Sequence, residues 1–280
     1  MGPYRIKSAD AAFLRTATNH PEIGLHSIYL GSLLPDDALQ HLVCGLHTKL
    51  KENERMLVFF PSCEDADVFA EKLSCAVFHS KLPDQGNTKD FNLARWDAGE
   101  TLVMACTSAF GAGVDRPNVR FIVIYNPSYN LQQTMQMVGR AGRDGRPSHA
   151  FFATSQQAAP SKWKKKKTTN LRKELGKVVY GKDCRVYEAS LHMDGELLAR
   201  RCEEIPNQIC CDVCEPDSEM HLFAVRAVAY PGMPVAGIRR LGHAAESGTA
   251  SHSDVKRGKM VERGEFGDRC GVRHSYDSLT

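Results

Sequence analysis

Residues 56–78 read MLVFFPSCEDADVFAEKLSCAVF and contain two apolar runs separated by a helical pattern. Residues 56–60 are continuously apolar, which is typical of a strand that is buried on both faces of a parallel sheet. Ser62 is placed to cap a helix over residues 66–73, and residues 76–78 form the next apolar run. This order of strand, helix and strand predicts a parallel βαβ unit.

The same alternation continues on both sides of this unit. Strands are expected at residues 27–30, 101–105, 120–125 and 149–153, and helices at residues 35–50, 88–98 and 131–142. Alternating strands and helices over residues 25–155 predict an α/β domain with a doubly wound, mostly parallel sheet. Residues 1–24 and 156–170 are polar, and we expect both to be linkers.

The composition is that of an ordinary globular protein. The 280 residues are 42% hydrophobic and 25% charged, with a net charge of +3. These values exclude a wholly disordered chain, a fibrous repeat and a coiled coil. No apolar run approaches the roughly 18 residues that a membrane span needs, and the first ten residues lack a signal-peptide core. We therefore expect a soluble intracellular protein without a membrane partner.

One candidate binding loop follows the strand expected at residues 101–105. Gly111 and Gly113 lie just beyond this strand, and Asp115 follows them. Ligands of open α/β sheets bind at the carboxyl ends of the strands, and glycines there allow backbone N–H groups to approach a phosphate closely. An ordinary tight turn is the alternative interpretation of these glycines.

A second candidate site is the sequence QQTMQMVGRAGRDG at residues 132–145. On a continuous helix, Gln136, Arg140 and Arg143 share one face because they are spaced at i, i+4 and i+7. Gly139 is small and allows another surface to come close. Two arginines on such a face suit a nucleoside triphosphate, although a solvated basic helix end is the alternative.

Four blocks of the sequence together resemble the second RecA-like domain of superfamily 2 helicases, specifically the RecQ family. They are MLVFFPSCEDADVFAEKL, FHSKL, VMACTSAFGAGVDRPNVRFIVIY and QMVGRAGRDG, in that order. The resemblance implies a RecA-like fold. It also implies that the chain is part of an ATP-dependent DNA helicase that moves 3′ to 5′, with DNA as its partner. The resemblance extends from about residue 56 to residue 152, including the strand after the last block, which is about a third of the chain.

The resemblance also implies roles for individual residues. Arg143 corresponds to the arginine finger, with Arg140 and Gln136 as its partners around the phosphates. Gly111, Gly113, Asp115 and Gly139 lie in blocks that bind or sense the nucleotide. Ser62, His79 and Thr107 lie in blocks that contact the DNA backbone, although Ser62 is equally well explained as a helix cap and His79 as a strand-end histidine.

The ATP-binding half of such a helicase is missing from this sequence. It contains neither a G-x-x-x-x-G-K-[ST] phosphate loop nor an Asp-Glu-x-His box. ATP and Mg²⁺ are therefore expected only when a separate first RecA-like domain is present. We expect half of a truncated or split helicase that is inactive alone, and a non-enzymatic DNA-binding module or a degenerate helicase fragment is the alternative.

Five of the ten cysteines crowd into residues 184–214. Cys211 and Cys214 have the Cys-x₂-Cys spacing that supplies two thiolates to tetrahedral Zn²⁺. The resemblance implies a small helical zinc-binding domain over residues 171–216, with Cys184, Cys202, Cys211 and Cys214 as ligands. The long spacing after Cys202 is similar to that of fungal RecQ-like and telomere-linked helicases. Cys210 competes with Cys211 as a ligand, and unliganded thiols are the alternative.

The remaining sequence is basic and then glycine-rich. Residues 162–182 hold nine lysines and arginines against one acid, Glu174. The run at residues 162–167 fits a nuclear localisation signal, a phosphate-contacting patch or a solvated linker, and we expect a nuclear protein. Residues 217–280 carry no long periodic segment and are expected to form a tail of low order.

Overall fold

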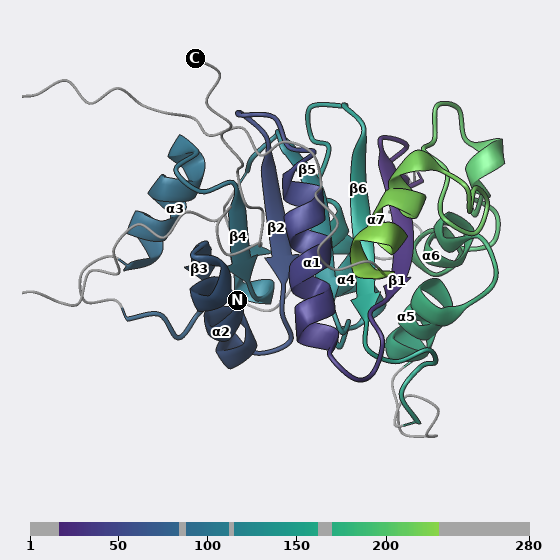
Figure 1. Cartoon of the computed structure of the whole chain (residues 1–280). Helices are drawn as coiled ribbons and strands as arrows, with labels where there is room; N and C mark the ends of the chain where they lie inside the picture. Colours follow the sequence, from purple (N-terminus) through teal and green to yellow (C-terminus); the bar gives the residue numbers. More distant parts are fainter. Residues whose placement is uncertain (1–16, 84–87, 112–114, 162–169, 230–280) are drawn as a thin grey trace, which may run out of the picture.

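The computed structural model of the chain describes residues 17–83, 88–111, 115–161 and 170–229 (Figure 1). Gly113, the basic run 162–167 and the sequence after residue 229 therefore lie outside the described residues. Among the described residues, no helix is both long and apolar enough to cross a membrane.

Six strands form one parallel sheet in the order β1-β6-β5-β2-β4-β3. This order confirms the predicted doubly wound parallel sheet, because the chain starts at one edge, crosses to the other half and returns. The strands are β1 (Ile23–Tyr29), β2 (Arg55–Phe59), β3 (Ala76–Phe78), β4 (Val103–Cys106), β5 (Val119–Tyr125) and β6 (Ser148–Thr154).

Helices cover both faces of the sheet, and α1 and α7 lie on the side opposite α4 (Figure 1). The helices are α1 (Pro35–His47), α2 (Cys63–Leu73), α3 (Thr88–Ala98), α4 (Leu131–Val138), α5 (Asn170–Tyr180), α6 (Arg185–Met193) and α7 (Glu219–Ala229). Two short 3₁₀ helices are η2 (Ser108–Gly111) and η4 (Cys202–Glu204).

The central strands are buried on both faces, as their unbroken apolar sequences require. Met56 and Val58 of β2 pack with α1, α2 and α7, whereas Leu57 and Phe59 face the opposite core with α3 and α4. Successive side chains of a strand point to opposite faces of the sheet. A continuous apolar run is therefore the sequence pattern that fits this position.

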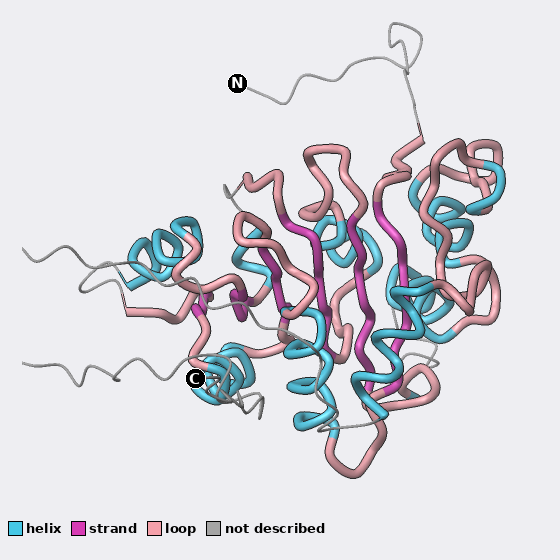
Figure 2. The backbone as a smooth tube through the Cα atoms, turned by 45° about the horizontal axis from the view of Figure 1, so that its top comes forward, coloured by secondary structure: helices cyan, strands magenta, loops and turns pink. Residues whose placement is uncertain are grey.

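The segment of residues 170–216, called the cysteine segment below, covers the outer edge of β1. Figure 2 shows it beyond the last strand of the sheet. The amide of Ile209 donates to the carbonyl of Pro21 at 2.9 Å, and that of Asp212 donates to the carbonyl of Leu25 at 3.2 Å. These bonds satisfy backbone groups that an edge strand otherwise leaves open to other chains.

The cysteine segment also shares its apolar core with the sheet. Leu175 and Val178 of α5 and Ala189 of α6 belong to the same cluster of buried side chains as Ile23 and Leu25 of β1. The segment that the sequence marked as a separate zinc-binding domain is thus packed against the α/β domain through a common core.

Helix α7 corrects the expectation of low order for the beginning of the tail. Ala224 is fully buried, and the partly buried Phe223 packs on the core cluster next to Gly45 of α1. A β-carbon on Gly45 of α1 would lie only 3.0 Å from the β-carbon of Ala227, so the two helices approach closely at that glycine. Residues 219–229 are ordered because this apolar face packs on α1, which the short sequence pattern did not reveal.

Two further boundaries differ from those expected. β1 begins at Ile23, inside the expected linker 1–24, because its edge pairs with β6 and with the cysteine segment. Helix α4 ends at Val138 rather than at residue 142, since Gly139 leaves the helical conformation with ψ of 9°.

Candidate nucleotide-binding arginines and cysteine site

The arginines of the GRAGRDG sequence lie in a turn and not on a helix. The amide of Gly142 donates to the carbonyl of Val119 at 3.1 Å, which holds the chain against the start of β5. Gly142 adopts φ of +63°, a left-handed conformation that favours glycine. The expected helical face of Gln136, Arg140 and Arg143 is therefore wrong for the two arginines, which follow the end of α4. We call residues 139–146 the arginine turn.

Arg143 contacts two of the predicted nucleotide-binding residues. Its Nη1 donates to Oδ1 of Asp115 at 2.5 Å, and its Nε donates to the carbonyl of Gly139 at 3.1 Å. The Asp115 side chain is 78% exposed, so this ion pair lies at the surface. Gly111 ends η2, and Gly113 lies outside the described residues.

Arg140 lies beside Arg143 in a partly buried, positively charged position. Burial lowers the pKa of Arg140, and the neighbouring charge of Arg143 lowers it further. Two guanidinium groups that repel each other gain from an anion between them. The arrangement is therefore suited to a phosphate group.

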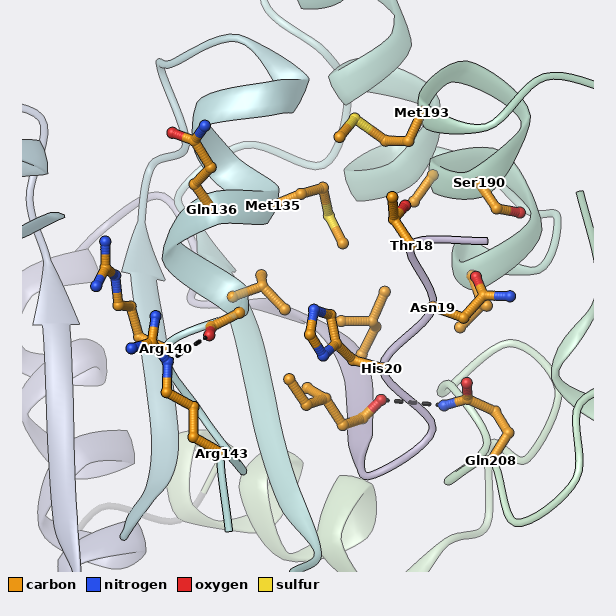
Figure 3. Close-up of a pocket in the computed structure, with 16 residues that line it drawn as sticks. Thr18, Asn19, His20, Met135, Gln136, Arg140, Arg143, Ser190, Met193 and Gln208 are labelled. Carbon is orange, nitrogen blue, oxygen red and sulfur yellow. Dashed lines mark hydrogen bonds between the residues drawn. The ribbon is translucent and has the colours of Figure 1, made fainter. Parts of the chain in front are cut away.

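A cavity of about 660 Å³ opens beside the arginine turn (Figure 3). Gln136, Gly139, Arg140 and Arg143 line one side of it, and His20 projects into its centre. Side chains of α6 and of the turn around Gln208 close the other side. The structure thus brings the four predicted residues of this block to one concave surface, next to the cysteine segment.

A buried arginine that the sequence analysis overlooked supports the arginine turn. Arg120 of β5 is 5% exposed, and its Nη2 donates to Oδ1 of Asp144 at 2.6 Å. Its Nη1 donates to the hydroxyl of Ser148 at 2.9 Å. Burial opposes ionisation of Asp144, but hydrogen bonds from Arg120 and Arg146 lower the pKa of its carboxyl group overall. The sequence signal that could have identified Arg120 is its position as a single arginine within an apolar strand.

The three predicted DNA-contacting residues differ in exposure. Ser62 caps α2 by accepting a hydrogen bond from the amide of Asp65 at 3.1 Å. His79 is 2% exposed, and its Nε2 lies 2.8 Å from Oδ1 of Asp67. Thr107 is 7% exposed and follows β4. Ser62 and Thr107 follow adjacent strands at the carboxyl edge of the sheet, whereas the ring of His79 is buried.

Four thiols of the cysteine segment converge on one point. The sulfur atoms of Cys184, Cys202, Cys211 and Cys214 all lie within 4.8 Å of one another. The Sγ atoms of Cys184 and Cys202 are 3.6 Å apart, and about 3.8 Å separates two thiolates in a tetrahedral zinc site with Zn–S bonds of about 2.3 Å. Cys211 belongs to this group and Cys210 does not.

The surroundings of the four thiols favour the thiolate form of one of them. Hydrogen bonds from the thiols of Cys184 and Cys202 lower the pKa of Cys211, while burial raises the pKa of Cys214 to about 12. The amide of Cys211 also donates to Sγ of Cys202 at 3.3 Å. Four cysteine sulfur atoms within 4.8 Å of one another form a donor set that fits Zn²⁺, which binds them as thiolates.

A buried ion pair holds the two halves of this site in place. Arg185, directly after Cys184, donates from Nη2 to Oδ2 of Asp212 at 2.8 Å and contacts the other carboxylate oxygen through Nε. Asp212 directly follows Cys211. The pair therefore connects the start of α6 to the Cys-x₂-Cys turn through a bidentate contact.

The α/β part of the chain is similar in sequence to helicases. Residues 36–145 match the family model of the helicase conserved C-terminal domain. The chain is 37% identical over 163 residues to the RecQ-like DNA helicase blm-1 of Caenorhabditis elegans, which covers 53% of this chain and 16% of that protein. It is 34% identical over 93 residues to the ATP-dependent helicase SGS1 of Saccharomyces cerevisiae. This match covers 32% of this chain and 6% of that protein.

Other similar proteins are RNA helicases. The DEAD-box ATP-dependent RNA helicase 27 of Oryza sativa is 33% identical over 135 residues, covering 45% of this chain and 22% of that protein. Among solved structures, S. cerevisiae Dbp5 bound to RNA and ADP BeF3 matches with a TM-score of 0.41 and 21% identity, covering 52% of this chain and 37% of that chain. The chain spans less than a quarter of the length of these three full-length relatives. Residues 36–145 are thus similar to helicase C-terminal domains, and the chain is similar in sequence to RecQ-like helicases.

Proposed function

We propose that this chain acts as the C-terminal half of an ATP-dependent, 3′-to-5′ RecQ-like DNA helicase of the fungal or telomere-linked type. The observation that carries the proposal is the arginine turn, in which Arg140 and Arg143 lie with Gln136 beside one cavity. The helicase C-terminal domain at residues 36–145 supports the same function.

In this proposal Arg143 is the arginine finger and Arg140 neutralises phosphate charge. Arginine fingers stabilise the charge that develops on the transferred phosphoryl group. Arg143 lies at the surface, and within the described part of the chain its partners are the exposed Asp115 carboxylate and a backbone carbonyl. An exposed ion pair contributes little stability, so the guanidinium can leave Asp115 for a phosphate oxygen at small cost.

ATP and Mg²⁺ are proposed to come from a separate first RecA-like domain. Such a domain supplies the phosphate-loop lysine and the carboxylate that holds the metal ion in this class of enzyme. The repulsion between Arg140 and Arg143 is the feature of this chain that fits the triphosphate. The residues of this chain then orient and stabilise the phosphates, and the chain alone does not turn over ATP.

The proposed DNA track runs along the carboxyl edge of the sheet. Ser62 after β2 and Thr107 after β4 lie on neighbouring strands of this edge. Hydroxyl groups and backbone amides at strand ends are typical contacts to phosphates of a nucleic acid. We further propose that the four clustered thiols hold one structural Zn²⁺.

An ATPase measurement with a matched arginine control tests this function. The full chain is mixed with a RecA-like domain that carries a phosphate loop, with single-stranded DNA present. Arg143→Ala should lower the ATPase rate about a thousandfold or more, with little loss of ATP binding, because a finger acts mainly in the transition state. Arg146→Ala changes an exposed arginine of the same turn and should leave the rate nearly unchanged.

Three results would overturn the proposal. One is DNA-stimulated hydrolysis of order 1 s⁻¹ by the chain alone, a rate within the usual enzyme range. Another is an equal loss of rate in both arginine variants. The third is DNA binding without any hydrolysis in the presence of the added domain, which would favour a non-enzymatic DNA-binding module.

A further inference from the structure

Helices α5 and α6 bring a second group of possible metal ligands together, apart from the four thiols. Glu188 and His192 are one turn apart on α6, and Glu174 reaches them from α5. One oxygen of each carboxylate and one imidazole nitrogen all lie within 4.8 Å of one another. We propose that these three residues bind a divalent transition-metal ion that connects α5 to α6.

The spacing on α6 is favourable for chelation. Residues four apart on a helix project from the same face, so Glu188 and His192 present two donor atoms from one rigid element. Glu174 comes from a different helix, and the chain between them includes Cys184 at the start of α6. A metal ion held by all three would therefore fix the angle between α5 and α6.

All three residues are partly buried, and two of them have a ligand atom without a hydrogen-bond partner. Oε2 of Glu188 and Nε2 of His192 are inaccessible to solvent, and neither has a hydrogen-bond partner among the described residues. Nε2 of His192 lies 2.5 Å from Oε2 of Glu174, yet the two groups are not oriented as donor and acceptor. Buried polar atoms without partners cost free energy, and a cation between them would remove that cost.

The chemistry of the donors selects the metal class. One imidazole and two carboxylates suit Zn²⁺ and its first-row neighbours, whereas Mg²⁺ and Ca²⁺ prefer oxygen ligands alone. Zn–N and Zn–O bonds of about 2.0–2.2 Å place two ligand atoms of a tetrahedron about 3.4 Å apart. Glu174 and His192 must therefore move apart by about 1 Å, and water completes the coordination.

Lys177 is the competitor for this site. Its Nζ lies 2.8 Å from Oε2 of Glu174, one turn along α5. The hydrogen bond to Glu174 raises the pKa of Lys177, so the lysine is charged at neutral pH. Because its side chain is 51% exposed, the ammonium can move into solvent when a metal ion occupies the carboxylate.

The experiment counts metal ions in the full chain. Protein is equilibrated with Zn²⁺, freed of excess metal by gel filtration and analysed by mass spectrometry for zinc. We expect two Zn²⁺ per chain for the unmodified protein and one for His192→Ala and for Glu188→Gln, which keeps the shape of the side chain. Glu196→Gln changes an exposed carboxylate of the loop after α6 and should retain two.

Co²⁺ distinguishes the two sites without reference to activity. The four thiolates give an intense sulfur-to-cobalt absorption, whereas an imidazole–carboxylate site adds only a weak ligand-field band. His192→Ala should lose the weak band and keep the intense one, which also shows that the cysteine segment is folded. Lys177→Met should lower the Zn²⁺ concentration needed to fill the second site.

The proposal is overturned if the unmodified protein binds one Zn²⁺ or fewer. It is also overturned if His192→Ala and Glu188→Gln retain the second ion, because that ion is then bound elsewhere. Weaker binding by Lys177→Met would show that the lysine supports the cluster as part of an ion-pair network. None of these outcomes depends on ATP hydrolysis, so the test is separate from that of the helicase function.

Discussion

Gly142 and Gly145 show how single residues shape the arginine turn. Both have positive φ, +63° and +75°, which L-amino acids with a β-carbon rarely adopt. They differ in their surroundings, since a β-carbon on Gly142 would lie 2.7 Å from Cγ of Glu22, whereas nothing lies within 4 Å at Gly145. A comparison of alanine substitutions at Gly142 and Gly145 therefore separates the free-energy cost of backbone strain from that of the close contact with Glu22.

We expect Gly142→Ala to lower the free energy of unfolding more than Gly145→Ala. The strain of the left-handed conformation costs roughly 1–2 kcal/mol at either position, and displacement of Glu22 adds roughly 1 kcal/mol at Gly142. Urea unfolding of the two variants measures the difference. Equal losses would show that Glu22 moves aside freely and that the close approach does not constrain the turn.

The cysteine segment is the element whose role depends most on its neighbours. Its four thiols define a compact site, but its backbone also donates to Pro21 and to Leu25 of β1. Loss of the metal-binding geometry should therefore expose the outer edge of the sheet as well as the segment itself. An exposed edge strand is a site for pairing with other chains.

Separate serine substitutions of the adjacent Cys210 and Cys211 test the metal site of the cysteine segment. Cys211→Ser should abolish the intense thiolate-to-cobalt absorption and lower the midpoint of thermal unfolding by more than about 5 °C, because structural zinc stabilises folding directly. Cys210→Ser should keep the absorption, since Cys210 lies outside the group of four thiols. Loss of the absorption in Cys210→Ser, with retention in Cys211→Ser, would reassign the third ligand.

At the scale of the whole molecule, three histidines resist protonation because His26 is buried and His47 and His149 are partly buried. Burial lowers the pKa of His47, at the end of α1, and that of His149, in β6, from 6.5 to about 4 each. Burial also lowers the pKa of His26 in β1 to about 2, and its Nε2 lies 3.0 Å from Nδ1 of His149. In the unfolded chain the pKa of each of these histidines is near its ordinary value of 6.5.

The stability of the protein should therefore fall as the pH is lowered from 7 towards 4. Between the unfolded pKa of about 6.5 and the folded pKa of about 4, the unfolded chain binds protons that the folded chain excludes. Each such histidine contributes up to about 1.4 kcal/mol of lost stability per pH unit. Urea unfolding at pH 7, 6 and 5 with constant zinc measures the slope.

His47→Gln is the matched variant for this dependence, because it removes one titrating group far from the thiols in sequence. Its free energy of unfolding should decline less steeply with falling pH than that of the unmodified protein. Identical slopes would show that His47 does not contribute to the effect.

Much of this molecule could be predicted from local sequence. The continuous apolar run at residues 56–60 identified a central strand because only a strand covered on both faces places every side chain in a core. The spacing of Cys211 and Cys214 identified two thiols of one turn. The helicase-like blocks predicted the sheet and the grouping of Gln136, Arg140 and Arg143, which the structure places beside one cavity. They did not predict that the arginine turn lies against the start of β5, because that position depends on the bond between Gly142 and Val119.

Only the tertiary structure decided the features that depend on contacts between distant residues. Val138 ends α4 because Gly142 bonds to Val119, 23 positions earlier, and this turn gives Arg140 and Arg143 their positions. Helix α7 is ordered because Phe223 and Ala224 find a core beneath α1, and β1 is extended because residues of the cysteine segment pair with it. Glu174, Glu188 and His192 meet only when α5 packs on α6. Periodicity reports which face of an element is apolar, but it does not specify which other element covers that face.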